Sequence, residues 1–256
     1  MIDLHSHLLP GVDDGARTIE RAVAVLGAMA SAGITGICLT PHLTATEAEA
    51  GVPPSHDEAF RLLVASAPAA PMLYRGAEVM LDRPLGRAAA ANPAVRLGDS
   101  RYILVEFPRL VAAATVSHAL AHIGSLGLVP VLAHPERYAS CTVEAVRRWR
   151  TFGAVMQVDA TTLLVPRRRG ERARQLVAEG LADILAADNH GDDRQLQTGR
   201  AMLEEHGGRE QAELLTERNP AAILADQAVD AVPPIVFRVS VLERLRRLWH
   251  MAGEDA

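Results

Sequence analysis

Apolar and polar positions along the chain follow two different periods in turn. Short apolar runs such as 34–40 and 128–133 have the length and continuous hydrophobicity of strands in a parallel sheet. Between them, segments such as 18–32 place apolar residues at helical spacing, with Thr18 suited to the N-cap and Gly33 to the C-cap. The pattern predicts strands at 1–5, 34–40, 72–79, 101–107, 128–133, 153–158 and 182–187, and helices at 18–32, 55–66, 112–126, 143–151, 169–180 and 195–206.

This alternation of strands and helices predicts right-handed βαβ units and a parallel sheet. Seven strands in a chain of 256 residues indicate an α/β fold of the distorted seven-stranded (β/α)7 TIM-like barrel type. We expect one barrel domain over residues 1–230. The Pro233-Pro234 pair marks the start of a C-terminal extension, 231–256, with an amphipathic helix at 239–249.

Composition and charge narrow the class of protein. The chain is 49% hydrophobic and 22% charged, which allows a large core. Its net charge of −5 does not favour nucleic acid as a partner. No stretch reaches the roughly 18 apolar residues of a membrane span, no signal peptide is recognisable, and two cysteines cannot build a disulfide framework. We therefore expect a cytoplasmic protein.

The predicted strands share one chemical feature, because each ends on or beside a histidine, aspartate or glutamate. His5 and His7, two residues apart at an extended strand end, point the same way. Glu78 and Glu106 interrupt apolar runs, and a buried carboxylate is costly unless it is paired or binds a metal. A structural ion pair is the alternative for these two glutamates, but the repetition favours a multinuclear hydrolytic metal centre. The residues at the seven ends are His5, His7, His42, Glu78, Glu106, His134, Asp159, Asp188 and His190.

These motifs resemble those of a known family. The chain is similar to the PHP (polymerase and histidinol phosphatase) superfamily. It resembles more closely the metal-dependent bacterial protein-tyrosine phosphatases that accompany capsule and exopolysaccharide tyrosine kinases. The combination of His5-Ser6-His7 with a following Asp-Asp-Gly and a later Ala-His-Pro-Glu-Arg-Tyr is specific to that group. The matching segments are 1–15, 40–42, 76–78, 99–107, 130–138, 157–158, 188–190 and 219–220.

The resemblance implies a site with three divalent metal ions, most commonly manganese, with iron or zinc as alternatives. It also implies phosphate-binding arginines, for which Arg137 is a direct match and Arg194 a looser one. The ions would exceed the charge of their carboxylate ligands by about +2, which suits a phosphate dianion. The implied ligand sets are His5, His7, Glu78 and Asp188 for the first ion, Glu78, Glu106 and His134 for the second, and Asp14, His42 and His190 for the third.

The implied function is hydrolysis of phosphotyrosine by a metal-activated hydroxide, without a covalent intermediate. The substrate would be the exposed tail of a phosphoprotein, in particular a tyrosine kinase of capsule or exopolysaccharide synthesis. The main alternative on the same fold is a small-molecule phosphomonoesterase such as a histidinol-phosphate phosphatase. A second alternative is a non-catalytic metal-binding or kinase-docking domain, against which the intact ligand set argues.

Two other motifs resemble catalytic or metal-binding patterns and are read as structural. Cys141 and Arg147 have the spacing of a cysteine-based phosphatase, but residues 142–146 lack the glycines of a phosphate-binding loop. Thr142 instead suits the N-cap of a helix. His118 and His122 are four residues apart without the glutamate of a His-Glu-x-x-His zinc motif, so they are read as histidines on a helix face.

Two surface features leave alternatives open. Arg167, Arg168 and Arg169 form a basic run on the expected active-site side, either simply solvated or able to guide an acidic phosphotyrosine tail. The C-terminal helix at 239–249 is expected to pack on the barrel or on a second subunit, and contact with a membrane surface is the alternative.

Overall fold

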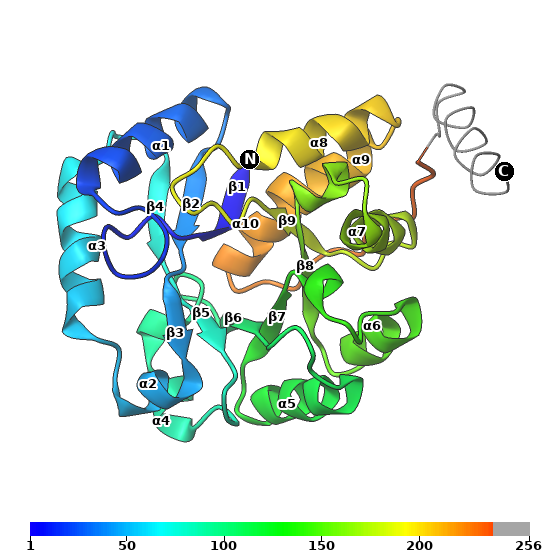
Figure 1. The fold of residues 1–256 in the computed structure, drawn as a ribbon, viewed down its shortest axis with the longest axis horizontal. Coiled ribbons are helices and arrows are strands. Elements are labelled where there is room, and N and C mark those ends of the chain that lie inside the picture. Colours follow the sequence, from blue (N-terminus) through cyan, green and yellow to red (C-terminus); the bar gives the residue numbers. More distant parts are fainter. Residues whose placement is uncertain (238–256) are drawn as a thin grey trace, which may run out of the picture.

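The computed structural model describes residues 1–237 as an alternation of strands and helices. The strands lie in the middle of the molecule, and most of the helices surround them (Figure 1). The strands are β1 (Ile2–Ser6), β2 (Gly36–Leu39), β3 (His42–Thr44), β4 (Met72–Arg75), β5 (Glu78–Met80), β6 (Tyr102–Glu106), β7 (Val129–Ala133), β8 (Val155–Asp159) and β9 (Ile184–Ala186). The helices are α1 (Ile19–Ser31), α2 (Ala45–Ala50), α3 (Pro54–Ser66), α4 (Arg87–Ala91), α5 (Ala113–Ser125), α6 (Val143–Arg150), α7 (Arg168–Ala178), α8 (Leu196–Glu205), α9 (Arg209–Glu213) and α10 (Asn219–Leu224).

The strands form two parallel sheets. One has the order β1-β2-β4, and the other has the order β3-β5-β6-β7-β8-β9. Every strand pair in these two sheets is parallel, so the predicted parallel α/β fold is confirmed. The two sheets meet beyond the end of β1, where Ser6 pairs with Asn189 and the His7 backbone N–H donates to the Asn189 carbonyl at 2.7 Å. The hydrogen bonds over residues 1–237 do not show the single closed seven-stranded barrel that we predicted.

A bend shared by two neighbouring segments explains the two sheets. The predicted strand 72–79 is divided into β4 and β5, which belong to different sheets. The division falls at Gly76, where an added Cβ would lie only 2.9 Å from the Cys38 sulfur. Pro41, which has no backbone N–H, separates β2 from β3 at the same level, and its carbonyl accepts from the Glu78 N–H at 3.0 Å. Both segments therefore leave one sheet and enter the other at this point.

The alternating strand residues supply two hydrophobic cores. On β6, Ile103 and Val105 face the core beneath the surrounding helices, whereas Tyr102 and Leu104 belong to a second core. The second core takes buried residues from strands of both sheets, together with Ile223 of α10. The inner faces of the two sheets thus share one packed interior.

The predicted helix boundaries agree with local hydrogen bonding. The Thr18 hydroxyl accepts from the Arg21 N–H at 3.3 Å and caps α1, as predicted. Beyond the end of α1, Gly33 has a φ of 86°, a left-handed conformation in which glycine carries no side-chain penalty. This turn directs the chain from α1 into β2.

The beginning of the predicted C-terminal extension packs against the rest of the chain. The Ile235 N–H donates to the Ala178 carbonyl of α7 at 3.2 Å. Gln211 of α9 donates through Nε2 to the carbonyl of Pro234 at 3.1 Å. The amphipathic helix predicted at 239–249 lies outside the described residues, and the domain boundary at 230 stays a prediction. In the part of the chain that the structure describes, no helix is long and apolar enough to cross a membrane.

Candidate metal centre

The polar residues predicted at the strand ends converge on one place. All of them except Asp159, together with Asp14, form four overlapping groups, and within each group the candidate donor atoms lie within 4.8 Å of one another. All nine residues predicted as metal ligands belong to at least one group. The groups are His5, His7 and Asp188; His5, Glu78 and His134; His42, Glu78 and Glu106; and His7, Asp14, His42 and His190.

The grouping differs in several details from the ligand sets implied by the sequence, and one of them is that His42 also belongs to the group of Glu78 and Glu106. Glu106 was paired with His134, but its carboxylate lies 3.5 Å from His42 Nδ1 and 4.0 Å from His134 Nε2. His7 was assigned to the first set only, and in the structure it also belongs to the group around Asp14. The groups share residues, so neighbouring sites at this centre would share ligands.

The innermost donor atoms have the spacing of a metal coordination shell. His5 Nε2 lies 3.1 Å from His7 Nε2, 3.2 Å from Glu78 Oε2 and 3.3 Å from Asp188 Oδ1. His7 Nε2 lies 3.3 Å from each of the same two carboxylate oxygens. Donor atoms around a tetrahedral divalent ion with bonds of about 2.0–2.1 Å are roughly 3.3 Å apart. His5, His7 and Asp188 therefore have the spacing of ligands to one such ion, and Glu78 Oε2 lies at a similar distance from both imidazoles.

Glu78 occupies the middle of the centre. Its Oε1 lies 2.9 Å from His134 Nε2, and its Oε2 lies 3.0 Å from His42 Nδ1, in addition to the contact with His5. Burial alone would raise the pKa of Glu78, but His5, His134 and His42 hold that pKa well below its ordinary value. Within residues 1–237, the buried Oε2 makes no hydrogen bond that would satisfy it. An ionised carboxylate with both oxygens facing imidazoles is suited to bridging two cations.

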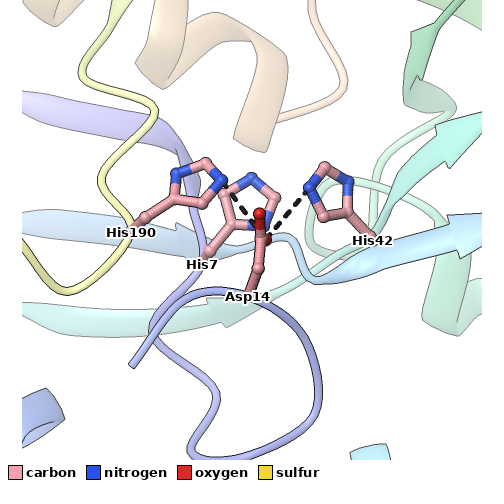
Figure 2. Close-up of side chains that lie close together, drawn as sticks. All are labelled: His7, Asp14, His42 and His190. Carbon is pink, nitrogen blue, oxygen red and sulfur yellow. Dashed lines mark ion pairs between the residues drawn. The ribbon is translucent and has the colours of Figure 1, made fainter. Parts of the chain in front are cut away.

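The group around Asp14 opens to solvent. Figure 2 shows the imidazoles of His7, His42 and His190 around the Asp14 carboxylate. Asp14 Oδ1 lies 3.4 Å from Nε2 of both His42 and His190, and the Asp14 side chain is 71% exposed. The His5 and His7 side chains are fully buried by comparison. The donor groups of the centre therefore range from fully buried, at His5 and His7, to solvent-exposed, at Asp14.

Two of the ligand-type residues have a backbone conformation that is rare outside glycine. His134, directly after β7, has a φ of 32°, and Asp188, just after β9, has a φ of 50°. Holding a non-glycine residue in this region costs on the order of 1–3 kcal/mol and is typical of functional sites. The surrounding structure therefore holds the backbone of His134 and Asp188 in an unfavourable conformation at the points where their side chains enter the centre.

Asp13 is a contributor that the sequence reasoning missed. Its Oδ2 lies 2.8 Å from His7 Nδ1 and also accepts from the His42 backbone N–H at 3.1 Å. Burial by itself would raise the pKa of Asp13, but the bond to His7 lowers it to about 2. A carboxylate on the far ring nitrogen orients a ligand histidine and leaves its other nitrogen facing the metal. The sequence motif identified the adjacent Asp14 as a candidate ligand. Which of the two aspartates faces the metal-type group and which one orients His7 depends on the conformation of the loop.

Gln157 has an equivalent role for the other buried imidazole. Its Oε1 lies 3.0 Å from His5 Nδ1, and the side chain is fully buried in β8. The His5 ring is therefore oriented so that Nε2 faces the donor set. A glutamine inside a strand carries no chemical signal that would have assigned it to the centre from the sequence.

The two predicted arginines reach the centre from different loops. Arg137 lies in the short helical turn after β7, and its Nη2 donates to Oδ2 of Asp188 and, at 2.9 Å, to Oδ2 of Asp159. Arg194 Nη1 donates to the same Asp188 oxygen at 3.4 Å, and its Nε bonds Asp192. Two guanidinium groups thus converge on the Asp188 carboxylate, while their role in catalysis stays a prediction.

Cys141 lies outside this centre. Its side chain is buried, and burial raises the pKa of its thiol to about 12. Thr142 caps α6 by accepting from the Ala145 N–H at 3.1 Å, as predicted, so the segment after Cys141 is a helix start. Of the histidine pair on α5, His122 bonds the Leu85 carbonyl through Nε2 at 2.8 Å. Neither His118 nor His122 appears in the metal-type groups of the described chain.

Fold and site together define a parallel α/β protein whose strand ends carry a centre rich in metal-ligand residues and flanked by arginines. Comparison with known families then gives the particular assignment. The chain belongs to the CpsB/CapC family of capsular polysaccharide synthesis, whose family model matches residues 1–225. The family resemblance seen in the sequence is thereby confirmed.

Characterised relatives cover nearly the whole chain. The tyrosine-protein phosphatase CpsB of Streptococcus pneumoniae is 27% identical over 243 residues, which is 90% of this chain and all of the relative. The tyrosine-protein phosphatase YwqE of Bacillus subtilis is 28% identical over 244 residues, 91% of this chain and 95% of the relative. A crystal structure from work on YwqE and CpsB, described as unique metal-dependent tyrosine phosphatases, matches with a TM-score of 0.77 at 26% identity. That match covers 93% of this chain and all of the other.

Proposed function

We propose that this protein is a metal-dependent protein-tyrosine phosphatase, a phosphoric monoester hydrolase of a capsule or exopolysaccharide system. The names of its relatives CpsB and YwqE support the substrate class. The observation that carries the proposal is the convergence of Glu78 with the surrounding imidazoles, beside two guanidinium groups. Cation sites next to phosphate-binding donors are the arrangement that phosphoryl transfer requires.

The proposed cofactor is a set of three divalent ions, manganese in preference to iron or zinc. Four groups of donors that share Glu78, His5, His7 and His42 support more than one site. Divalent ions, when bound, lower the pKa of water and stabilise negative charge on phosphoryl oxygens. The ligands are proposed to be His5, His7, Asp14, His42, Glu78, Glu106, His134, Asp188 and His190.

The proposed overall architecture is a distorted (β/α)7 TIM-like barrel of the PHP superfamily. The pairing of Ser6 with Asn189 and the inner core common to both sheets support it. In a barrel of this kind, the carboxyl ends of the strands form an open mouth. The solvent-facing Asp14 group would lie at that mouth, where a side chain on a protruding segment can enter.

The protein's own residues would bind and orient the phosphate. Arg137 and Arg194 carry permanently charged guanidinium donors suited to phosphoryl oxygens. Among the described residues 1–237 no side chain stands out as a general acid beside the centre, so we infer that the leaving group departs with little assistance. A tyrosine phenolate, whose conjugate acid has a pKa of about 10, is a far better leaving group than an alkoxide. We therefore infer a preference for aryl over alkyl phosphate monoesters.

The proposed partner is an exposed phosphotyrosine tail, in particular that of a tyrosine kinase. A substrate made by an ATP-dependent kinase would place the reaction in the cytoplasm. Arg167, Arg168 and Arg169 are exposed at the start of α7, after β8, where they could meet an acidic tail. Assembly of the protein into oligomers through the C-terminal helix concerns residues outside those described and remains an expectation.

Initial rates on two substrates test the proposal. With manganese added, we expect clear turnover of a phosphotyrosine peptide and little turnover of histidinol phosphate at the same concentration. The physical reason is the difference in leaving-group basicity. Preference for histidinol phosphate would assign the protein to the small-molecule branch. Absence of turnover on both, in protein that binds metal, would favour a non-catalytic domain.

We expect turnover to be lost when metal is removed and to be retained when the Cys141 thiol is removed. We expect a chelator to abolish turnover and added manganese to restore it, because the donors of the centre are those of a cation site. We expect Cys141→Ser to retain turnover within about twofold, because a buried thiol of high pKa is not a nucleophile. Rates and metal content of both samples measure the difference. A Cys141→Ser protein that holds its metal but is inactive would contradict the metal mechanism.

A further inference from the structure

Asp159, the last residue of β8, lies beside the metal-type groups without belonging to them. Its side chain is almost completely buried. One carboxylate oxygen, Oδ1, accepts from the Thr161 N–H at 2.9 Å, the Thr161 hydroxyl at 2.7 Å and the Thr162 N–H at 3.2 Å. The carboxylate is thus held by its own loop through one oxygen, and the other oxygen is available for a different partner.

That partner is Arg137. Asp159 Oδ2 accepts from Arg137 Nη2 at 2.9 Å. The connection is reinforced by the backbone, because the Asp159 N–H donates to Oε1 of Glu136, the residue before the arginine, at 2.9 Å. The end of β8 and the turn that carries Arg137 are therefore joined through both side chain and main chain.

The contacts of Arg137 leave part of its guanidinium group available. Nη2 is the donor to both Asp159 and Asp188. Nε is buried without a hydrogen-bond partner, and Nη1 makes no hydrogen bond within residues 1–237. An arginine held through Nη2 retains its Nη1 hydrogens for a charge-assisted hydrogen bond to an oxyanion.

The two carboxylates that hold Arg137 differ in their other contacts. Asp188 Oδ1 lies 3.3 Å from Nε2 of both His5 and His7, so Asp188 belongs to the proposed ligand set. Asp159 contacts none of the imidazoles in that set and makes its remaining bonds to its own loop. Of the two carboxylates, Asp159 is therefore the one whose contact toward the centre is with Arg137 only.

We propose that Asp159 is a positioning residue that anchors Arg137 through Nη2 and keeps the other guanidinium donors in place for a phosphate group. This inference rests on the proposed function, in which Arg137 binds phosphate. It concerns a residue that neither ligates metal nor touches substrate. Its effect would be transmitted through Arg137 only.

The Asp159→Asn variant distinguishes two effects of Asp159 on phosphate binding: positioning of Arg137 and the negative charge of the carboxylate. Asparagine can keep the Oδ1 bonds to Thr161 and Thr162, but its amide NH₂ then faces Arg137 Nη2, donor against donor. Loss of one negative charge would by itself strengthen the attraction of the centre for an anion. Loss of the anchor would weaken phosphate binding. The two explanations predict changes of opposite sign.

The experiment is calorimetric titration of inorganic phosphate into the full-length, manganese-loaded protein. We expect Asp159→Asn to keep its metal content and to bind phosphate about tenfold more weakly than wild type. The effect should disappear in the background of Arg137→Ala, so that the double variant binds no worse than Arg137→Ala alone. Tighter or unchanged binding by Asp159→Asn, or a loss that adds fully to that of Arg137→Ala, overturns the proposal.

Two further variants guard against a merely structural explanation. Asp183→Asn is a matched control, because Asp183 is also buried and also pairs with an arginine, Arg150, at 2.8 Å. Asp183 precedes β9, so it lies at the end of the strands opposite the centre. It should retain wild-type phosphate affinity. If Asp159→Asn does not fold, Asp159→Glu preserves the charge but moves the carboxylate. Positioning then predicts weaker phosphate binding, and wild-type binding by Asp159→Glu overturns the proposal.

Failure of this inference is distinguishable from failure of the proposed function. Phosphate titration does not require hydrolysis of phosphotyrosine. A wild-type protein that binds phosphate through the Asp159–Arg137 pair but does not hydrolyse phosphotyrosine contradicts the function alone. Active wild-type protein with an Asp159→Asn variant of unchanged phosphate affinity contradicts the inference alone, and wild-type protein that binds no phosphate also overturns it.

Discussion

Replacement of Glu78 by glutamine is expected to cause the largest loss of metal and of activity among the conservative substitutions in the centre. Glu78 faces His5, His42 and His134 through its two oxygens and belongs to two of the donor groups. An amide of the same shape removes the negative charge and turns a donor toward a cation or an imidazole. We expect turnover to fall by at least about 10²–10³-fold, the scale of removing one preorganised electrostatic group.

Metal analysis together with kcat/KM on a phosphotyrosine peptide measures this effect. Glu136→Gln is the matched control for metal content, because Glu136 is equally buried and burial raises the pKa of its carboxyl to about 8. Near neutral pH that side chain is mostly protonated, so glutamine is a close substitute and metal content should be retained. A Glu78→Gln protein with full metal content and normal turnover would show that Glu78 is a structural ion-pair partner.

The second large effect is expected for Arg137→Ala, which should retain its metals and lose about two orders of magnitude in turnover. Arg137 donates to Asp159 and to the proposed ligand Asp188, but it offers no metal-binding atom itself. Its loss would remove a charged donor from the developing phosphoryl charge, and single donors of this kind contribute about 10²–10³-fold. Single-turnover and steady-state kinetics, with metal content measured on the same samples, test this.

Arg150→Ala is the matched control for Arg137→Ala. Arg150 is also partly buried and pairs with the buried Asp183, but it lies away from the metal-type groups of the described residues. We expect Arg150→Ala to lower thermal stability and to leave kcat/KM of the folded protein near the wild-type value. Near-normal turnover of Arg137→Ala would mean that this arginine, too, serves mainly to hold the structure together.

Local pattern was sufficient to predict much of the fold. The helix 18–32 was recognisable because its apolar spacing, its Thr18 cap and the following Gly33 all act within a few residues of one another. The same holds for Thr142, which caps α6 and distinguishes Cys141 from a catalytic cysteine. Continuous apolar runs likewise identified the parallel strands, because strands covered on both faces need no polar alternation.

The division of these strands into two sheets was not predictable from that pattern. It depends on the close approach of Gly76, between β4 and β5, to Cys38 of β2 and on the position of Pro41, between β2 and β3. The short strands that begin at His42 and Glu78 follow from this bend. Glu78 was predicted near the end of the strand 72–79 and His42 just after the strand 34–40, and the structure places both where two neighbouring segments change sheet together.

The sequence by itself determined the chemical character of the protein, because imidazoles and carboxylates recur at the ends of apolar runs and those ends meet in a parallel fold. Only the tertiary structure decided which donor atoms face one another and which side chains orient them. Asp13 is bound to His7, Gln157 to His5 and Asp159 to Arg137. Two of these three contacts join residues far apart in the chain, and the third depends on how a loop turns. Hydrogen-bond geometry of this kind is fixed by packing and has no periodic trace in the sequence.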